Sequence, residues 1–223
     1  MDRLLTIIGE LREHCVWTKA LTHAQLVEFL IEESYELVET IEEQHGDAEL
    51  KGELGDLLLQ LVLHSAIAEE RGSFNFNDVA EGLADKMIRR NVHIYKPDGS
   101  FQDSFPSTTE EVIEKWDAAK RAEKPERTHP FAGLPDSLPA LMLAEKAIAR
   151  AERWEAGTGQ HVPSPAVASA DRQTGERQDV RPEAWTEESF GAYLLQLVQE
   201  AHKGGIDPER ALRGAVRAWK NSI

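Results

Sequence analysis

One apolar stripe near the N-terminus constrains the fold most, because it repeats with the period of an α-helix. Between residues 26 and 41, the positions that would share one helix face recur at spacings of four, three, four and four. They are occupied by Leu26, Leu30, Glu33, Leu37 and Ile41. This pattern predicts an amphipathic helix packed against a core. Glu33 is the exception, because a carboxylate in an apolar position is costly to bury unless a partner compensates its charge.

The remaining apolar patterns are also helical, and no segment shows the alternation of a strand. Start signals agree with this, since Thr22 and Gln25 form a capping-box pattern and Asp207-Pro208 places a good N-cap before a proline. We therefore predict an all-α fold, with a tight turn over residues 96–100. Helices are expected over about residues 2–13, 22–44, 47–71, 77–90, 107–122, 141–154, 186–202 and 208–220.

Composition divides the chain into successive regions. Residues 1–122 hold the first five predicted helices and form the first domain. Residues 123–139 contain four prolines and are predicted to be a linker. Residues 140–223 hold the last three helices. Within that region, residues 155–184 are rich in Gly, Pro, Ser and charge and lack apolar periodicity, so we predict a disordered loop there.

The charge balance narrows the range of partners. The chain has 223 residues, with 40 Asp and Glu against 25 Lys and Arg, and its net charge is −15. This negative charge repels phosphate backbones and anionic lipids, so we expect neither a nucleic-acid nor a membrane partner. No apolar run approaches the roughly 20 residues of a membrane span, and the N-terminus does not resemble a signal peptide. With a single cysteine, Cys15, no intramolecular disulfide can form, and we expect a cytoplasmic protein.

Two pairs of acidic residues are placed where a surface would not explain them. Glu33 and Glu36 lie three residues apart on the first stripe, and Glu53 and Asp56 lie three apart at the start of the next, strongly apolar helix. A short connection containing glycine makes these two helices antiparallel neighbours. Four clustered carboxylates must take up protons or bind cations, and oxygen-only ligands suit Mg²⁺ or Mn²⁺ rather than zinc. An ordinary solvated acidic face is the alternative.

The same residues resemble a known family. Residues 32–36 read EESYE and residues 53–56 read ELGD, which is similar to the EExxE…ExxD signature of MazG-type nucleoside triphosphate pyrophosphohydrolases. Residues 15–23, residues 85–90 (DKMIRR) and the Trp116…Lys120 spacing also resemble that family, in the same order, so that the likeness covers roughly residues 1–150. The resemblance implies a MazG-like helical bundle, a homodimer, and Mg²⁺-dependent hydrolysis of nucleoside triphosphates to the monophosphate and pyrophosphate.

The resemblance also implies roles for particular residues. The metal ligands and catalytic residues would be Glu33, Glu36, Glu53 and Asp56. The substrate-binding residues would be Lys86, Arg90, Trp116, Lys120 and Trp17. In this scheme the cations neutralise the phosphates and Trp116 stacks on the base. Mg²⁺ is the expected cofactor, with Mn²⁺ as a substitute.

The C-terminal region resembles a degenerate second copy of the same domain. Residues 137–141 and 205–212 are similar to the beginning and end of the second copy that many family members carry. Residues 188–192 align with its central acidic stretch, but Ser189 and Ala192 stand where the ExxD acids belong. We therefore predict a degenerate second copy without a metal site.

The expected function is hydrolysis of nucleoside triphosphates in the service of nucleotide-pool cleaning. Two alternatives stay open at this point. One is a selective pyrophosphohydrolase of the same fold, acting on dUTP, dCTP or phosphoribosyl-ATP. The other is a non-catalytic helical regulator whose carboxylates are structural.

Overall fold

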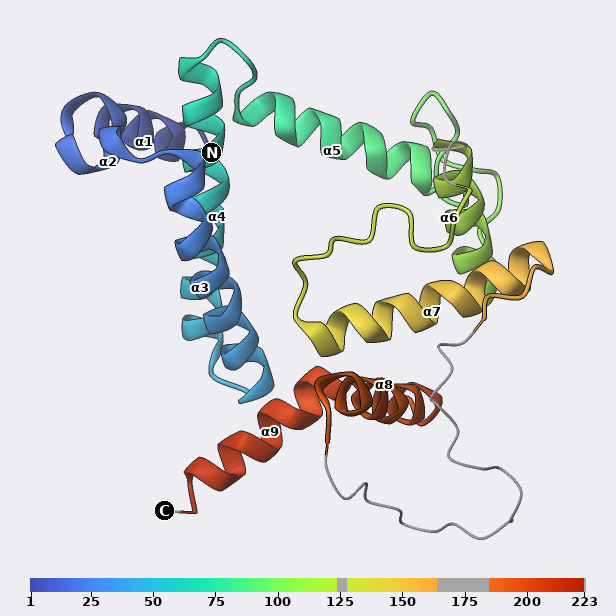
Figure 1. Ribbon diagram of the computed structural model, residues 1–223. Helices are drawn as coiled ribbons and strands as arrows, with labels where there is room; N and C mark the ends of the chain where they lie inside the picture. The colour runs from blue at the N-terminus through green and yellow to red at the C-terminus, as the bar shows by residue number, and fades with distance from the viewer. Residues whose placement is uncertain (124–127, 164–184, 223) are drawn as a thin grey trace, which may run out of the picture. The chain divides into compact units, whose positions relative to one another are not determined.

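The computed structural model describes residues 1–123, 128–163 and 185–222, and within these residues it has nine α-helices and no strand. The prediction of an all-α fold is confirmed. The chain divides into two compact units, Met1–Glu123 and Lys124–Ile223. The helices of the first unit (Figure 1) are α1 (Asp2–His14), α2 (Val16–Ala20), α3 (His23–Glu42), α4 (Asp47–Glu70), α5 (Phe76–Arg90) and α6 (Thr109–Glu123). Those of the second are α7 (Ala140–Thr158), α8 (Glu187–Lys203) and α9 (Pro208–Lys220).

Several boundaries differ from those predicted. The five-residue α2 was not expected, because it is too short to show a period. Helix α5 begins at Phe76, since Asn75 caps it and Asp78 completes the capping box. Helix α7 continues to Thr158, so the first residues of the loop predicted over 155–184 are helical. Residues 164–184 of that loop lie outside the described residues. An isolated bridge between Tyr95 and Phe101 closes the turn predicted at 96–100.

The first unit is built around an antiparallel pair, α3 and α4, which lie side by side in Figure 1. Helix α3 starts at the predicted capping box: the Gln25 backbone N–H donates to Thr22 Oγ1 at 3.3 Å, and the Thr22 N–H donates to Gln25 Oε1 at 3.0 Å. The chain reverses at Gln44, whose φ is +57°, and Gly46 is the N-cap of α4. The short connection places the two acidic motifs opposite each other.

The core of this unit lies between α1, the start of α3 and the second half of α4. It consists of Ile8, Leu21, Leu26, Val62, Leu63 and Ile67. The predicted stripe is buried at Leu26 but exposed at Ile41. Helix α4 is not buried on every side, because Leu54 and Leu61 are each 52% exposed in the single chain.

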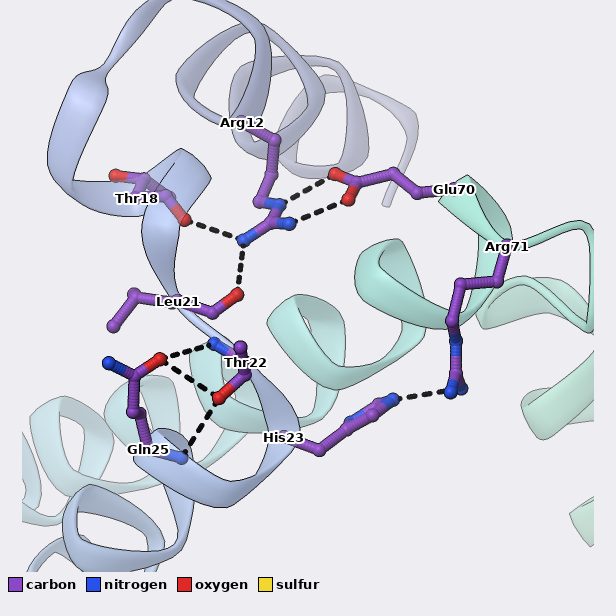
Figure 2. A network of polar contacts seen from close by, with 8 residues as sticks. All are labelled: Arg12, Thr18, Leu21, Thr22, His23, Gln25, Glu70 and Arg71. Atoms are coloured by element: carbon purple, nitrogen blue, oxygen red, sulfur yellow. Dashed lines mark hydrogen bonds and ion pairs between the residues drawn. The ribbon is translucent and has the colours of Figure 1, made fainter.

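Buried Arg12 links α1 to the C-terminal end of α4, as Figure 2 shows. Arg12 donates from Nε and Nη2 to the two carboxylate oxygens of Glu70, at 2.7 and 2.6 Å. Its Nη1 donates to the backbone carbonyl oxygens of Thr18 and Leu21. The guanidinium therefore satisfies one carboxylate and two buried carbonyls, and it fixes α1 and the turn before α3 to the C-terminal end of α4.

A stacked histidine pair fastens the same end of the hairpin. The rings of His23 and His64 are nearly parallel, with centroids 5.0 Å apart and Nδ1 atoms 2.7 Å apart. Arg71 Nη2 lies 3.0 Å from His23 Nε2 (Figure 2). Arginine can only donate, so His23 carries its proton on Nδ1 and donates it to His64. Burial and the neighbouring His23 lower the pKa of His64, which favours the neutral form of that ring.

The second unit packs α7 against α8 and α9. Helix α8 begins at a capping box formed by Thr186 and Ser189, and α9 begins with Asp207 as N-cap and Pro208 at its first turn, as its sequence predicts. His202 of α8 lies 2.8 Å from Glu152 and 3.5 Å from Glu145, both on α7. These contacts hold the two longer helices of the unit together.

Candidate functional site

Three carboxylates meet halfway along the α3–α4 pair. Glu33 extends from α3, and Glu53 and Asp56 extend from α4. One carboxylate oxygen from each of the three lies within 4.8 Å of the others. The spacing of three residues between Glu53 and Asp56 places both on the side of α4 that faces Glu33. The sequence predicted this convergence of the two acidic motifs, and the antiparallel hairpin produces it.

The electrostatics of the cluster are repulsive. Burial raises the pKa of Glu33, and Asp56, Glu36 and Glu53 raise it further by their charge. Burial also raises the pKa of Glu53, together with the charges of Glu36 and Asp56. Among the described residues, no ion pair joins Glu33, Glu53 or Asp56 to a Lys, Arg or His. The cluster therefore holds net negative charge, which His45 offsets only in part by lowering the pKa of Glu53.

The chemistry of the cluster fits a divalent cation with oxygen ligands. Glu53 Oε2 is buried and has no hydrogen-bond partner, and a carboxylate oxygen left in that state is costly. The three oxygens are close enough to contact one ion, and Mg²⁺ and Mn²⁺ prefer carboxylate ligands. A cation would satisfy the orphaned oxygen and remove the repulsion that raises the two pKa values.

The fourth predicted ligand, Glu36, stands apart from this group. It is exposed on α3, and no oxygen of Glu36 belongs to the three-carboxylate group. Its charge nevertheless acts on both Glu33 and Glu53. Glu32, the additional acid of the motif, is exposed and acts only on Glu33.

The predicted substrate-binding residues lie elsewhere in the first unit. Lys86 and Arg90 are on α5, and Trp116 and Lys120 are on α6. Arg90 and Trp116 meet, with the guanidinium carbon 5.8 Å from the centre of the Trp116 ring. Trp17 lies on α2 and is 66% exposed.

The structure does not bring these residues to the carboxylates within one chain. In the part of the chain that the structure describes, α5 packs against α4 and α6 but not against α3, and α6 packs only against α5. Helix α2, which carries Trp17, contacts only α1. Figure 1 shows α5 leading away from the end of α4 that is opposite the hairpin turn.

Sequence reasoning missed three residues near these groups. Gln60 follows Asp56 by one helical turn on α4, is only 4% exposed, and has no hydrogen-bond partner for Oε1. Arg89 and Glu123 belong to the Arg90 contacts at the junction of α5 and α6. Nothing in the sequence marks Glu123, because its partners are 33 and 34 residues away. Gln60 could have been found from the sequence, because a polar residue within an apolar run indicates a buried polar group.

The fold and the carboxylate cluster define an all-α protein with a candidate site for a hard divalent cation. A comparison with protein-family models matches residues 21–95 to the MazG nucleotide pyrophosphohydrolase domain. That range contains α3, α4 and α5. None of the described helices combines the length and apolar character needed to cross a membrane.

Curated relatives extend the match over most of the chain. A protein of Escherichia coli K12 named nucleoside triphosphate pyrophosphohydrolase is 35% identical over 225 residues, which is 96% of this chain and 82% of the relative. A Thermotoga maritima protein named nucleoside triphosphate pyrophosphohydrolase/pyrophosphatase MazG is 33% identical, over 98% of this chain and 82% of its own. The chain therefore belongs to the MazG family of nucleotide pyrophosphohydrolases, which are hydrolases acting on phosphoric anhydrides. The family resemblance found in the sequence is confirmed.

Among solved structures, a MazG-related protein from Thermotoga maritima is similar, with 23% identity and a TM-score of 0.46. The match covers 54% of this chain and 99% of that one.

Proposed function

We propose that this protein hydrolyses nucleoside triphosphates to the monophosphate and pyrophosphate, with Mg²⁺ held by the α3–α4 carboxylates. The observation that carries the proposal is the group of Glu33, Glu53 and Asp56, whose oxygens lie within 4.8 Å of one another. The names of the relatives support the reaction. A cation is needed on physical grounds, because a triphosphate would be expelled by these carboxylates alone.

Glu33, Glu53 and Asp56 would hold the metal, and Glu36 adds negative charge beside them. When bound, Mg²⁺ or Mn²⁺ supplies charge neutralisation for the phosphates and lowers the pKa of a coordinated water. Glu33 or Glu36 accepts the proton of the attacking water.

The cations of α5 and α6 are proposed to bind the substrate. Lys86 and Arg90 lie one turn apart on α5 and attract the phosphates. Trp116 offers a ring for stacking on the base, with Lys120 one turn further along α6 and Trp17 as a second exposed ring. The pool of substrates is proposed to be broad, which suits nucleotide-pool cleaning.

A homodimer would complete the site. Because α5 and α6 do not reach α3 within the described chain, the substrate-binding residues of one copy would approach the carboxylates of the other. Exposed apolar residues at spacings of four follow α3 on either side of Glu33 and suit such a contact. They are Val27, Ile31 and Tyr35.

The decisive experiment is pyrophosphate release from the eight common NTPs and dNTPs, with and without Mg²⁺. Wild-type protein should release pyrophosphate only with the metal, and Glu53→Gln should abolish the release. Glu69→Gln, an exposed change further along α4, is the matched control and should behave as wild type. Silence from folded wild-type protein with every nucleotide, or a Glu53→Gln variant that keeps its activity, would overturn the proposal.

The shared site has a separate test. Glu53→Gln and Arg90→Ala each inactivate the protein by a different defect, so mixed dimers regain one intact site. Mixing the two inactive variants after dissociation should restore about one quarter of the wild-type activity. If mixing restores nothing while native mass spectrometry shows that mixed dimers form, each site lies within one chain.

A further inference from the structure

The last residue of α6 binds two consecutive arginines of α5. Glu123 Oε2 accepts hydrogen bonds from Arg90 Nε at 2.9 Å and from Arg90 Nη2 at 2.7 Å. Glu123 Oε1 accepts one from Arg89 Nε at 3.1 Å. The single carboxylate therefore bridges two cations that would otherwise repel each other.

These contacts fix how the Arg90 guanidinium is oriented. Its Nε–Nη2 edge is held by Glu123, and its central carbon lies 5.8 Å from the centre of the Trp116 ring. The Arg90 and Glu123 side chains are only 19% and 18% exposed, so both are held within the α5–α6 junction. No described hydrogen bond involves Arg90 Nη1, which leaves that edge available for an incoming acceptor.

Glu123 remains charged while it does this. Its hydrogen bonds to Arg90 and Arg89 lower the pKa of the carboxyl group, even though burial opposes the shift. The group of three side chains keeps a net positive charge, because two arginines face one carboxylate. Lys86, one turn before Arg90 on α5, adds another cation. The junction is thus an ordered cationic surface in an acidic chain, and its chemistry suits a polyphosphate.

We propose that Glu123 is a positioning residue for nucleotide binding, which orients Arg90 so that its free edge receives a phosphate of the substrate. The proposal rests on the proposed function, in which Arg90 binds the triphosphate. Without Glu123, Arg90 would have to give up rotamer freedom each time the substrate binds, and Arg89 would repel it. Glu123 does not touch the reacting atoms, so its loss should weaken binding and leave the chemical step intact.

The same contacts would also fit a role for Glu123 that predicts the opposite change in substrate affinity. A carboxylate bound to an arginine can be an internal competitor that the phosphate must displace. In that case, removing the charge of Glu123 would tighten substrate binding. The geometry favours positioning, because the carboxylate engages one edge of the guanidinium and leaves Nη1 without a described bond.

The test compares Glu123→Gln, Glu123→Asp and the control Glu114→Gln, an exposed change on the same helix. Coupled residues in one hydrogen-bond network typically show interaction energies that correspond to about a twofold to 150-fold change in affinity. Glu123→Gln should fall in the lower part of that range and raise KM by about fivefold to tenfold, with kcat within about twofold of wild type. Glu123→Asp keeps the charge but is one methylene too short for both arginines, so its KM should be intermediate. Glu114→Gln should leave both constants unchanged.

A double-mutant cycle separates positioning from a merely structural role. Because Arg90→Ala abolishes turnover, the cycle is measured as affinity for a non-hydrolysable nucleotide. In the Arg90→Ala background, Glu123→Gln should have no further effect on that affinity, because the residue acts through Arg90. A structural role would instead lower the unfolding temperature and the active fraction, which changes kcat rather than KM. An unchanged or lower KM in Glu123→Gln, or fully additive effects with Arg90→Ala, would overturn the inference.

Failure of this inference can be told apart from failure of the proposed function. If wild-type protein releases pyrophosphate and Glu123→Gln matches it in KM, only the role of Glu123 is wrong. If wild-type protein releases none, the affinity for Mg²⁺ and a non-hydrolysable nucleotide, measured by calorimetry, replaces KM as the readout. Wild-type protein that neither hydrolyses nor binds nucleotides would reject both.

Discussion

Helices α4 and α8 carry similar four-residue segments with different chemistry. Residues 53–56 read Glu-Leu-Gly-Asp on α4, and residues 189–192 read Ser-Phe-Gly-Ala on α8. On α4 the two acids meet Glu33 of the neighbouring helix. On α8, Ser189 serves the helix start, since its N–H donates to Thr186 Oγ1 at 3.1 Å and its Oγ accepts from the Thr186 N–H at 3.0 Å. Where Glu53 contributes a carboxylate oxygen to the cluster, Ser189 caps its own helix.

The two units also differ in how their carboxylates are compensated. In the second unit, Glu145 and Glu152 of α7 face His202 of α8, which can supply an internal positive charge. In the first unit, Glu33, Glu53 and Asp56 lie against one another, and Glu36 adds further negative charge. Among the described residues, the group of three carboxylates that could hold a metal ion lies in the first unit, and such clustered negative charge is what a metal site requires.

The strongest test of this comparison is the double change Glu33→Ala and Asp56→Ala in the full chain. It removes one ligand from each helix, so pyrophosphate release should fall by at least about 100-fold, since even changes that only support a metal ligand cost 10- to 100-fold. The measurement is the initial rate with saturating Mg²⁺. The matched change in the second unit, Glu188→Gln with Ser189→Ala, should leave the rate unchanged. Substantial activity in the first double variant would mean that the second unit supplies a site of its own.

Metal binding should also appear as stability. Mg²⁺ at about 100 times its dissociation constant should stabilise wild-type protein against urea by about 2.7 kcal/mol, and should not stabilise Glu53→Gln. Without divalent metal, Glu53→Gln should be at least as stable as wild type. Because the pKa of Glu53 is raised in the folded protein, its protonated form favours folding and its ionised form opposes it. The stability that the protonated form contributes is lost as pH rises through the raised pKa. Equal stabilisation of wild type and variant by Mg²⁺ would place the metal elsewhere.

Glu70, also on α4, should show the opposite dependence of stability on pH. Arg12 lowers the pKa of Glu70, so this group stabilises the fold above the ordinary pKa of a glutamate, and the effect is lost as pH falls through its lowered pKa. Glu70→Gln should destabilise the protein by about 1–2 kcal/mol at neutral pH, since Arg12 stays buried with one charged partner fewer. The difference from wild type should shrink at about pH 3. The check is urea unfolding at both pH values, with exposed Glu69→Gln as control. A constant difference would show that packing, not charge, explains the loss.

Local signals in the sequence predicted much of the fold, because helices and their caps depend on near neighbours. The capping box at Thr22 and Gln25, the Asp207-Pro208 start and the antiparallel hairpin are all present. The start of α5 was placed too late, because its capping box closes with Asp78 rather than with Glu or Gln. The exposure of Leu54 and Leu61 could not be read from the sequence, because an apolar run does not show which of its sides pack within one chain.

Long-range contacts could not be predicted from one sequence. Arg12 lies on a helix whose apolar stripe gives no hint that a cation is buried beside it, and its partner Glu70 is 58 residues away. The His23–His64 stack joins residues 41 apart, and the contact of Glu123 with Arg90 joins residues 33 apart. The carboxylate site was an easier case, because its residues form two short motifs on adjacent helices. The position of Glu36 outside the group of three depends on side-chain directions that spacing alone does not give.

The smallest effect is expected for the contact of His202 with Glu145 and Glu152 in the second unit. His202→Gln should destabilise the protein by no more than about 1 kcal/mol, because Glu152 is well exposed and exposed ion pairs contribute little. The difference should shrink in high salt, which screens the charges. Lys203→Gln, which removes an exposed contact to Glu200, is the control. Pyrophosphate release should be unchanged in both variants, measured beside urea unfolding at low and high salt. If His202→Gln instead lowers the rate, the carboxylates of α7 act in the reaction, and the two units cannot be separated into one with a site and one without.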